Sequence, residues 1–339
     1  MIKIALDAMG GDNAPHDVVH GGIEAARLSK NRYEVVLVGD KESIEKEISR
    51  HFHTANLPLT IVHATQVVSM NEQPAVALKM KDSSISVSIS LLKNNKVDAF
   101  VSAGNTGAVM ASALFGLKRI KGIRRPAIGS MLPTETGSSL LIDAGANVDC
   151  RPLDLLQFAI MGSIYYSRVY AKPDTTVGLL SIGHEDSKGN EVVIKANELF
   201  KDSSLNFIGN IEGGDILRGK VHVVACDGFV GNIVLKVAES LHGLLKFNLR
   251  RFIRKYFFSQ IGAMLMKPTF DGIKKVFDYQ EYGGAPLLGV DGNCIIAHGR
   301  STPRAIKNAI LVAYKMVTEN VNVHITETLS NLSFAQVEK

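Results

Sequence analysis

The chain has 339 residues, of which 46% are hydrophobic and 21% charged, and its formal net charge is +5. This composition is typical of a folded globular protein and excludes a largely disordered or fibrous chain. The length allows one large α/β unit or two lobes, and the mild basic excess does not indicate a nucleic-acid partner.

Cysteine usage and hydropathy indicate where the protein works. Cys150, Cys226 and Cys294 are far apart and odd in number, so we expect no disulfide framework, as in a reducing compartment. The apolar run in residues 1–7 is too short for a signal peptide. No apolar stretch reaches the ~20 residues of a spanning helix. We therefore expect a cytoplasmic protein that does not cross a membrane.

Short β-branched runs alternate with segments of helical length. The runs that predict strands are residues 2–6, 35–38, 59–62, 97–101, 140–142, 177–182 and 221–225. Residues 85–92, 153–170 and 191–200 have helical length and apolar spacing, and Pro152 suits a first helical turn. Such alternation predicts crossover units and a mainly parallel central sheet with flanking helices. We expect one α/β unit over residues 1–339, with two discontinuous lobes as the alternative.

Glycine-bearing turns follow several of these strands. Their candidate anion-binding residues are Gly10, Gly11, Asp12, Gly104, Asn105, Thr106, Gly107, Asp143, Asn147, Gly228, Gly231, Asn232, Gly283 and Gly284. Open α/β sheets bind ligands at the carboxyl ends of strands. Glycine permits close backbone approach, and helix N-terminal amides favour an anion. Each turn alone is equally well explained as a plain strand-to-helix connection, but together they favour a phosphate site.

Common catalytic and nucleotide-binding motifs are missing from the sequence. It has no G-x-G-x-x-G after the first strand and no G-x-x-x-x-G-K-[ST], which leaves a small anion or an unusual nucleotide pose. Nucleophile-elbow and zinc motifs are also missing, so we predict neither a covalent nucleophile nor a metal. His298, after the apolar residues 294–296, is balanced between an acid–base and a structural role. Lys188 could meet phosphate from a glycine-flanked turn, although most surface lysines have no such role.

Residues 241–275 combine a basic amphipathic helix with an apolar tip. Leu241, Leu245, Leu249, Phe252 and Tyr256 recur at helical spacing, and Lys246, Arg250, Arg251, Arg254 and Lys255 occupy the other side. The tip includes Phe257, Phe258, Met264 and Leu265. A core or dimer helix with a solvated basic face explains this pattern as well as a surface for an acidic protein or anionic lipid does.

A series of ordered motifs resembles the bacterial phosphate acyltransferase family of phospholipid synthesis, PlsX. They are residues 7–15 (DAMGGDNAP), 102–108 (SAGNTGA), 143–147 (DAGAN), 207–213 (FIGNIEG), 226–232 (CDGFVGN), 283–289 (GGAPLLG) and 298–299 (HG). The chain departs from the family's Asn-x-Gly-Glu-Glu pattern at residues 181–185 (SIGHE), where Ser181 and His184 replace its first and fourth positions.

The resemblance implies transfer of a long-chain acyl group from acyl carrier protein to inorganic phosphate. The acyl phosphate would serve a downstream glycerol-3-phosphate acyltransferase. It also implies a homodimer with a fold like phosphotransacetylase and isocitrate dehydrogenase, a deep cleft between lobes and no cofactor. Phosphate is itself the nucleophile in this reaction, so the protein must hold a dianion and stabilise an oxyanion.

For this reaction we expect the following residue roles, and rival functions stay open. Residues 104–107 and 228–232 would cradle phosphate, Lys188 would neutralise its charge, and His298 or Asp227 would handle protons. The basic face and the tip of residues 241–275 would contact acyl carrier protein or the inner face of the cell membrane. The rivals are a phosphotransacetylase acting on acyl-coenzyme A and a non-catalytic scaffold that lost turnover through changes such as His184. A related dehydrogenase is disfavoured because the sequence shows no metal-binding aspartate cluster.

Overall fold

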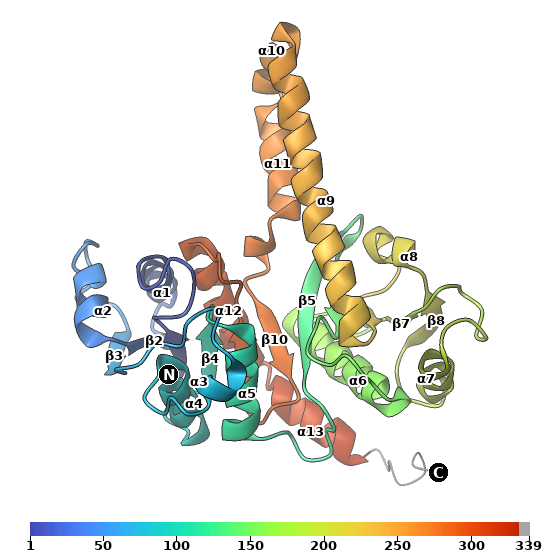
Figure 1. The fold of residues 1–339 in the computed structure, drawn as a ribbon, viewed down its shortest axis with the longest axis horizontal. Helices are drawn as coiled ribbons and strands as arrows, with labels where there is room; N and C mark the ends of the chain where they lie inside the picture. Colours follow the sequence, from blue (N-terminus) through green and yellow to red (C-terminus); the bar gives the residue numbers. More distant parts are fainter. Residues whose placement is uncertain (332–339) are drawn as a thin grey trace.

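The computed structural model describes residues 1–331, and within them eleven strands form one sheet (Figure 1). In spatial order they are β3 (Leu59–His63), β2 (Tyr33–Gly39), β1 (Ile2–Asp7), β4 (Ala99–Ser102), β11 (Asn293–Ile296), β10 (Ala285–Leu288), β5 (Ala127–Thr134), β6 (Gly137–Ile142), β9 (Val223–Ala225), β7 (Val177–Leu180) and β8 (Phe207–Ile211). The strands from β3 to β11 are mutually parallel, and so are those from β6 to β8. The predicted mainly parallel sheet is confirmed.

Helices cover both faces of the sheet. Besides the arm described below, they are α1 (His16–Leu28), α2 (Lys41–Ile48), α3 (Pro74–Ala77), α4 (Ser84–Lys93), α5 (Thr106–Leu117), α6 (Pro152–Val169), α7 (Glu191–Lys201), α8 (Gly213–Arg218), α12 (Pro303–Thr318) and α13 (Val321–Asn331). Successive residues of a strand point to opposite faces. Ile4 and Leu6 accordingly join the core beneath α1, α6 and α12, whereas Ala5 joins the core beneath α4 and α5.

Two antiparallel strands at the centre join the parallel groups. β10 is antiparallel to β11 and to β5, and β5 is antiparallel to β6. The end of β11 at Ile296 lies opposite Ala285, and the end of β6 at Ile142 lies opposite Gly129. These partners are close to the residues through which β10 pairs with β5. The carboxyl ends of both groups therefore meet at the central seam, where ligands bind in open α/β sheets.

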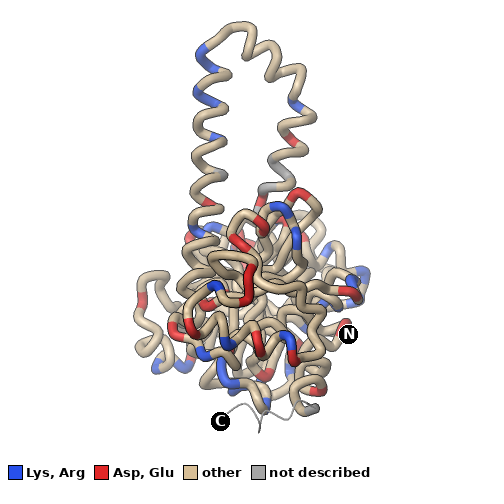
Figure 2. Tube along the Cα trace, turned by 90° about the vertical axis from the view of Figure 1, so that its right-hand side faces the viewer, with Lys and Arg blue, Asp and Glu red and all other residues tan. Residues whose placement is uncertain are grey.

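An arm of three helices rises from the body above this seam (Figure 1). It consists of α9 (Gly228–Lys255), α10 (Phe257–Leu265) and α11 (Lys267–Phe277), and the extended Tyr256 separates α9 from α10. In the perpendicular view α9 and α11 stand apart and are joined at the tip by α10 (Figure 2). No helix among the described residues is long and apolar enough to span a membrane.

The arm differs in part from the helix expected within residues 241–275. Its first helix begins earlier, at Gly228, because Asp227 caps it by accepting the amide hydrogen of Val230. The apolar stripe of α9 is exposed rather than packed on the body, with Leu249 and Phe252 47% and 53% exposed. Exposed apolar side chains that form a contiguous patch are typical of interaction sites.

Candidate active site

A cleft of about 740 Å³ opens at the central seam. Its polar side is lined by Thr106, Ser130, Gly145, Asn232, Lys236, Glu239, Gly283, Gly284, His298, Arg300 and Ser301. Apolar side chains of β5, α8 and α9 line most of the rest. One cavity thus joins a polar end, which carries two cationic side chains, to an apolar wall.

The turn after β1 is organised by a buried carboxylate. Asp7 accepts a hydrogen bond from Ser102 Oγ at 2.6 Å and another from the amide of Met9 at 3.2 Å. Burial raises the pKa of Asp7. A Cβ on Gly10 would lie 2.3 Å from Asp7 Oδ2 and 2.7 Å from the nitrogen of Gly104, so only glycine fits there. Asp7 therefore holds the turn of residues 7–12 against the turn after β4.

The turn after β4 presents the N-terminus of α5 to the cleft. Asn105 caps this helix by accepting from the amide of Ala108 at 2.9 Å. Its Nδ2 donates to the carbonyl oxygens of Met70 and Glu72 at 2.8 and 2.9 Å. The Asn105 side chain is thus engaged within the protein. The first amides of a helix have no carbonyl partner in that helix, and Thr106 at this end lines the cleft.

Asp143 organises the loop after β6. One carboxylate oxygen accepts from the amides of Ile128, Gly145 and Ala146 at 3.0, 3.2 and 3.0 Å. The other accepts from the amide and Nδ2 of Asn147 at 2.7 and 2.8 Å. Burial raises the pKa of Asp143 despite these donors. Asp143 and Asn147 therefore shape this loop with side chains that are already engaged.

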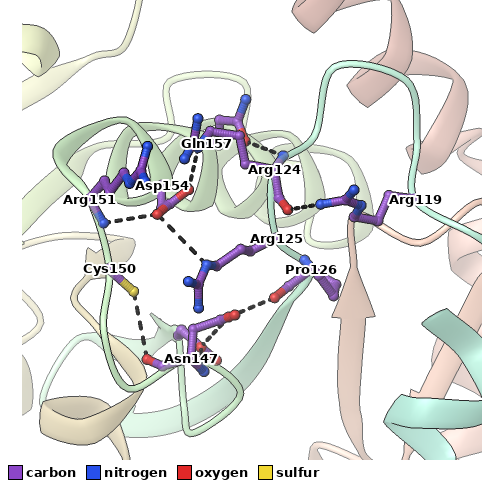
Figure 3. Close-up of polar contacts among 10 residues, drawn as sticks. Arg119, Arg124, Arg125, Pro126, Asn147, Cys150, Arg151, Asp154 and Gln157 are labelled. Atoms are coloured by element: carbon purple, nitrogen blue, oxygen red, sulfur yellow. Dashed lines mark hydrogen bonds and ion pairs between the residues drawn. The ribbon is translucent and has the colours of Figure 1, made fainter. Parts of the chain in front are cut away.

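A polar network supports the same loop from behind (Figure 3). Asn147 Nδ2 also donates to the carbonyl oxygen of Pro126 at 2.7 Å, and the Cys150 thiol contacts the Asn147 carbonyl oxygen at 3.6 Å. Beside them the buried Asp154 accepts from Arg124 Nε at 3.0 Å. Burial raises the pKa of Cys150 to about 12, so this thiol stays protonated and is a poor nucleophile.

The start of α9 packs directly on the loop of residues 143–147. A Cβ on Gly228 would lie 2.7 Å from a carbonyl oxygen of that loop, and a Cβ on Gly231 would lie 1.9 Å from another. Both positions therefore require glycine for packing. Asn232, one residue further along α9, reaches the cleft.

The turn after β11 forms another part of the polar end. His298 and Arg300 both line the cleft, and His298 Nδ1 accepts from the amide of Arg300 at 3.1 Å. The amide of Asp12 donates to the main chain of this turn, at Gly299 O, over 2.8 Å. This bond links the turn after β1 to the turn after β11, and Asp7 links the turn after β1 to the turn after β4. The three turns are therefore held together.

Lys188 lies in the exposed turn of residues 183–190, outside the cleft lining. The turn follows β7, which is separated from β6 by β9. Ser181 Oγ donates to the carbonyl oxygen of Lys188 at 2.9 Å, and His184 Nε2 lies 2.6 Å from Asp215 Oδ2. The two residues that depart from the family pattern therefore make contacts that hold this turn.

The structure sorts the predicted site residues into two groups. Those that line the cleft are Thr106, Asn232, Gly283, Gly284 and His298. Those that lie outside its lining are Gly10, Gly11, Asp12, Gly104, Asn105, Gly107, Asp143, Asn147, Lys188, Asp227, Gly228 and Gly231. The sequence interpretation missed Arg300, two residues after His298, and Lys236, four residues after Asn232 on α9. Among the described residues no group of three or more His, Cys, Asp or Glu could hold a metal ion.

Comparisons with known proteins show the family of the chain and its fold. The family described as Fatty acid synthesis protein matches residues 2–324. The phosphate acyltransferase of Pelotomaculum thermopropionicum is 48% identical over 332 residues, covering 98% of this chain and 96% of the relative. That of Dictyoglomus turgidum is 50% identical over 335 residues, covering 98% and 99%. A phosphotransacetylase structure from Streptococcus pyogenes has a TM-score of 0.65 at 17% identity, covering 94% of each chain, which confirms the predicted fold.

Proposed function

Since the chain belongs to the fatty acid synthesis protein family and is an acyltransferase like its phosphate acyltransferase relatives, we propose that it transfers a long-chain acyl group from acyl carrier protein to inorganic phosphate. The acyl phosphate product would supply a glycerol-3-phosphate acyltransferase in phospholipid synthesis. The observation that carries the proposal is a cleft that joins a polar end with cationic side chains to an apolar wall.

The phosphate would bind at the polar end of the cleft. The N-terminus of α5 at Thr106 offers unpaired amides and the positive end of the helix dipole. Arg300 adds a cationic side chain in the same cavity, where Lys236 is paired with Glu239. Held there, phosphate needs no separate enzyme nucleophile, because its own oxygen attacks the thioester carbon. The buried aspartates Asp7 and Asp143 would act by fixing the surrounding turns.

Few side chains are candidates for proton transfer and for neutralising charge. His298 is the candidate acid or base because it lines the cleft. A departing thiolate with a pKa near ~8.5 needs little protonation, so positioning and charge neutralisation should dominate. Asp227 caps α9 and would act by positioning that helix. Lys188 would reach phosphate only if its exposed turn moved toward the cleft.

The arm would provide the surface for the larger partners. We assign Arg250, Arg251, Arg254 and Lys255 to contact with acidic acyl carrier protein, because long-range charge attraction speeds such encounters. The exposed Phe257, Phe258, Met264 and Leu265 would rest on the inner face of the cell membrane. The outer part of the exposed apolar stripe of α9, at Leu249 and Phe252, would be covered by a second copy in a homodimer working at the cytoplasmic side.

The test is release of thiol from purified palmitoyl-acyl carrier protein, with and without inorganic phosphate. Hydroxylamine is added to trap acyl phosphate as the hydroxamate. We expect thiol release that depends on phosphate and a matching yield of hydroxamate. Turnover on acyl-coenzyme A but not on the carrier would instead identify a phosphotransacetylase. No turnover on either thioester would favour the non-catalytic scaffold.

The same assay decides the two residue roles that are least secured by geometry. The Lys188→Ala variant should lose phosphate affinity if its turn closes on the cleft, and full activity with an unchanged KM for phosphate would refute that role.

For His298→Asn we expect a fall in kcat of about 100-fold, the lower end for loss of a general acid or base.

A further inference from the structure

We infer that the apolar wall of the cleft, from Leu235 to Leu245 of α9, is the channel that holds the acyl chain, and that its side chains set the chain length accepted. This inference rests on the proposed function and deepens it by naming the determinants of substrate length. Its occupant is the hydrocarbon tail of the thioester and of the acyl phosphate product.

The channel follows a row of α9 with steps of mostly three residues, which winds partly around the helix. Asn232, Leu235, Ala238, Leu241 and Leu245 all line the cleft and follow one another at steps of three or four residues. Such residues are neighbours on a helix surface. At 1.5 Å per residue the row extends for about 20 Å. Its first member is polar and lies at the anion-binding end, and the next four are apolar.

The opposite wall is also apolar. It is made by Met131, Leu132 and Pro133 of β5 and by Leu217 of α8. Ala238 is partly buried and packs against the core cluster that contains Leu132, so α9 and β5 are close together at this small side chain. A larger residue there would fill the space between α9 and β5.

The charges along the channel are balanced locally. Lys236 and Glu239 both line the cleft, and Lys236 Nζ lies 2.8 Å from Glu239 Oε2. This ion pair keeps a net charge away from the apolar row. Further out, Leu241 and Leu245 are 45% and 59% exposed. The channel therefore opens along the arm instead of ending in a wall, which suits a long chain.

Continuity with the polar end identifies the occupant. A thioester carbon placed for attack by a phosphate at Thr106 must carry its hydrocarbon tail away from the charged groups. The apolar wall of the same cavity provides that path. Each methylene buried there should raise kcat/KM by roughly fourfold, the equivalent of about 0.8 kcal/mol.

The experiment measures kcat/KM for octanoyl, dodecanoyl and palmitoyl thioesters of acyl carrier protein with inorganic phosphate. Two variants obstruct the channel at different depths, Ala238→Phe near the polar end and Leu245→Trp near the opening. We expect Ala238→Phe to lower the palmitoyl-to-octanoyl ratio at least tenfold and the dodecanoyl-to-octanoyl ratio as well. Leu245→Trp should lower the palmitoyl ratio and spare the dodecanoyl ratio.

Val237→Phe is the matched control, since Val237 neighbours Ala238 but is 60% exposed and does not line the cleft. Its chain-length profile should equal that of the unmodified protein. Equal profiles in all four proteins would overturn the channel. No phosphate-dependent turnover of any thioester by the unmodified protein would instead overturn the proposed function. If Ala238→Phe fails to fold, Leu245→Trp at its exposed position still decides the question.

Discussion

At the scale of single residues, Asp143 accepts hydrogen bonds from four backbone amides and from the Asn147 side chain. In the Asp143→Asn variant an NH₂ group replaces one acceptor oxygen and faces at least two buried donors. A buried donor without a partner costs about 1–3 kcal/mol. We expect the free energy of unfolding in urea to fall by about 2–4 kcal/mol. Asp149→Asn, an exposed change just outside the loop, should stay within about 0.5 kcal/mol of the parent.

The difference in stability between the parent and Asp143→Asn should also depend on pH. Burial raises the pKa of Asp143 above its usual 3.8, so the folded protein binds the proton more tightly than the unfolded chain does. The stabilising contribution of the protonated carboxyl is fully present below 3.8 and is lost as the pH rises through the folded pKa. The stability gap between the parent and Asp143→Asn should therefore narrow with rising pH. A gap that widens instead would contradict the raised pKa.

Single residues also show where sequence reasoning reaches its limit. The glycine turns could be predicted, because glycine after a buried strand marks close backbone approach, as Gly10 and Gly231 show. Whether a polar residue in such a turn faces ligand or protein could not, because both uses favour the same side chains. The sequence predicts Asn105 and Asp143 as ligands, whereas in the structure their polar atoms are engaged with other parts of the protein.

At the scale of elements, the environment of a strand decides whether the sequence predicts it. Buried parallel strands such as β2 and β4 are continuous apolar runs and were predicted. The central strands β5 and β10 contain Pro133 and Pro286, and proline argues against a strand interior. These strands form the seam of the cleft, so the part of the sheet that places the site was the part least visible in the sequence.

The basic outer half of α9 gives the element-scale prediction. Reversing two charges, Arg250→Glu with Arg254→Glu, should raise the KM for acyl carrier protein roughly tenfold at low ionic strength, because the steering attraction becomes repulsion. The dependence of kcat/KM on salt should flatten or invert. Lys93→Glu with Lys96→Glu makes the same charge change at exposed positions at and just beyond the end of α4 on the body. If kcat/KM depends on salt in the same way in both variants, acyl carrier protein does not bind the basic half of α9.

At the scale of the whole molecule, the arm leaves apolar side chains exposed in a single chain. α9 and α11 stand apart (Figure 2), and the outer stripe of α9 is exposed at Leu249 and Phe252. Two copies that cover these stripes against each other would place both α10 tips at the same end of the molecule. Two tips bind one membrane with higher avidity than one tip does. Dimer formation and membrane binding should therefore depend on the same side chains.

Leu249→Glu with Phe252→Glu tests this dependence. Burying carboxylates in the apolar interface is unfavourable, so light scattering should change from a dimer to a monomer. Flotation with anionic phospholipid vesicles should fall at the same time, although the α10 tip itself is unchanged. Leu28→Glu with Phe52→Glu, at exposed apolar positions of the body, should preserve both. A variant that stays dimeric would move the interface elsewhere, and a monomer that floats as well as the parent would show that one tip suffices.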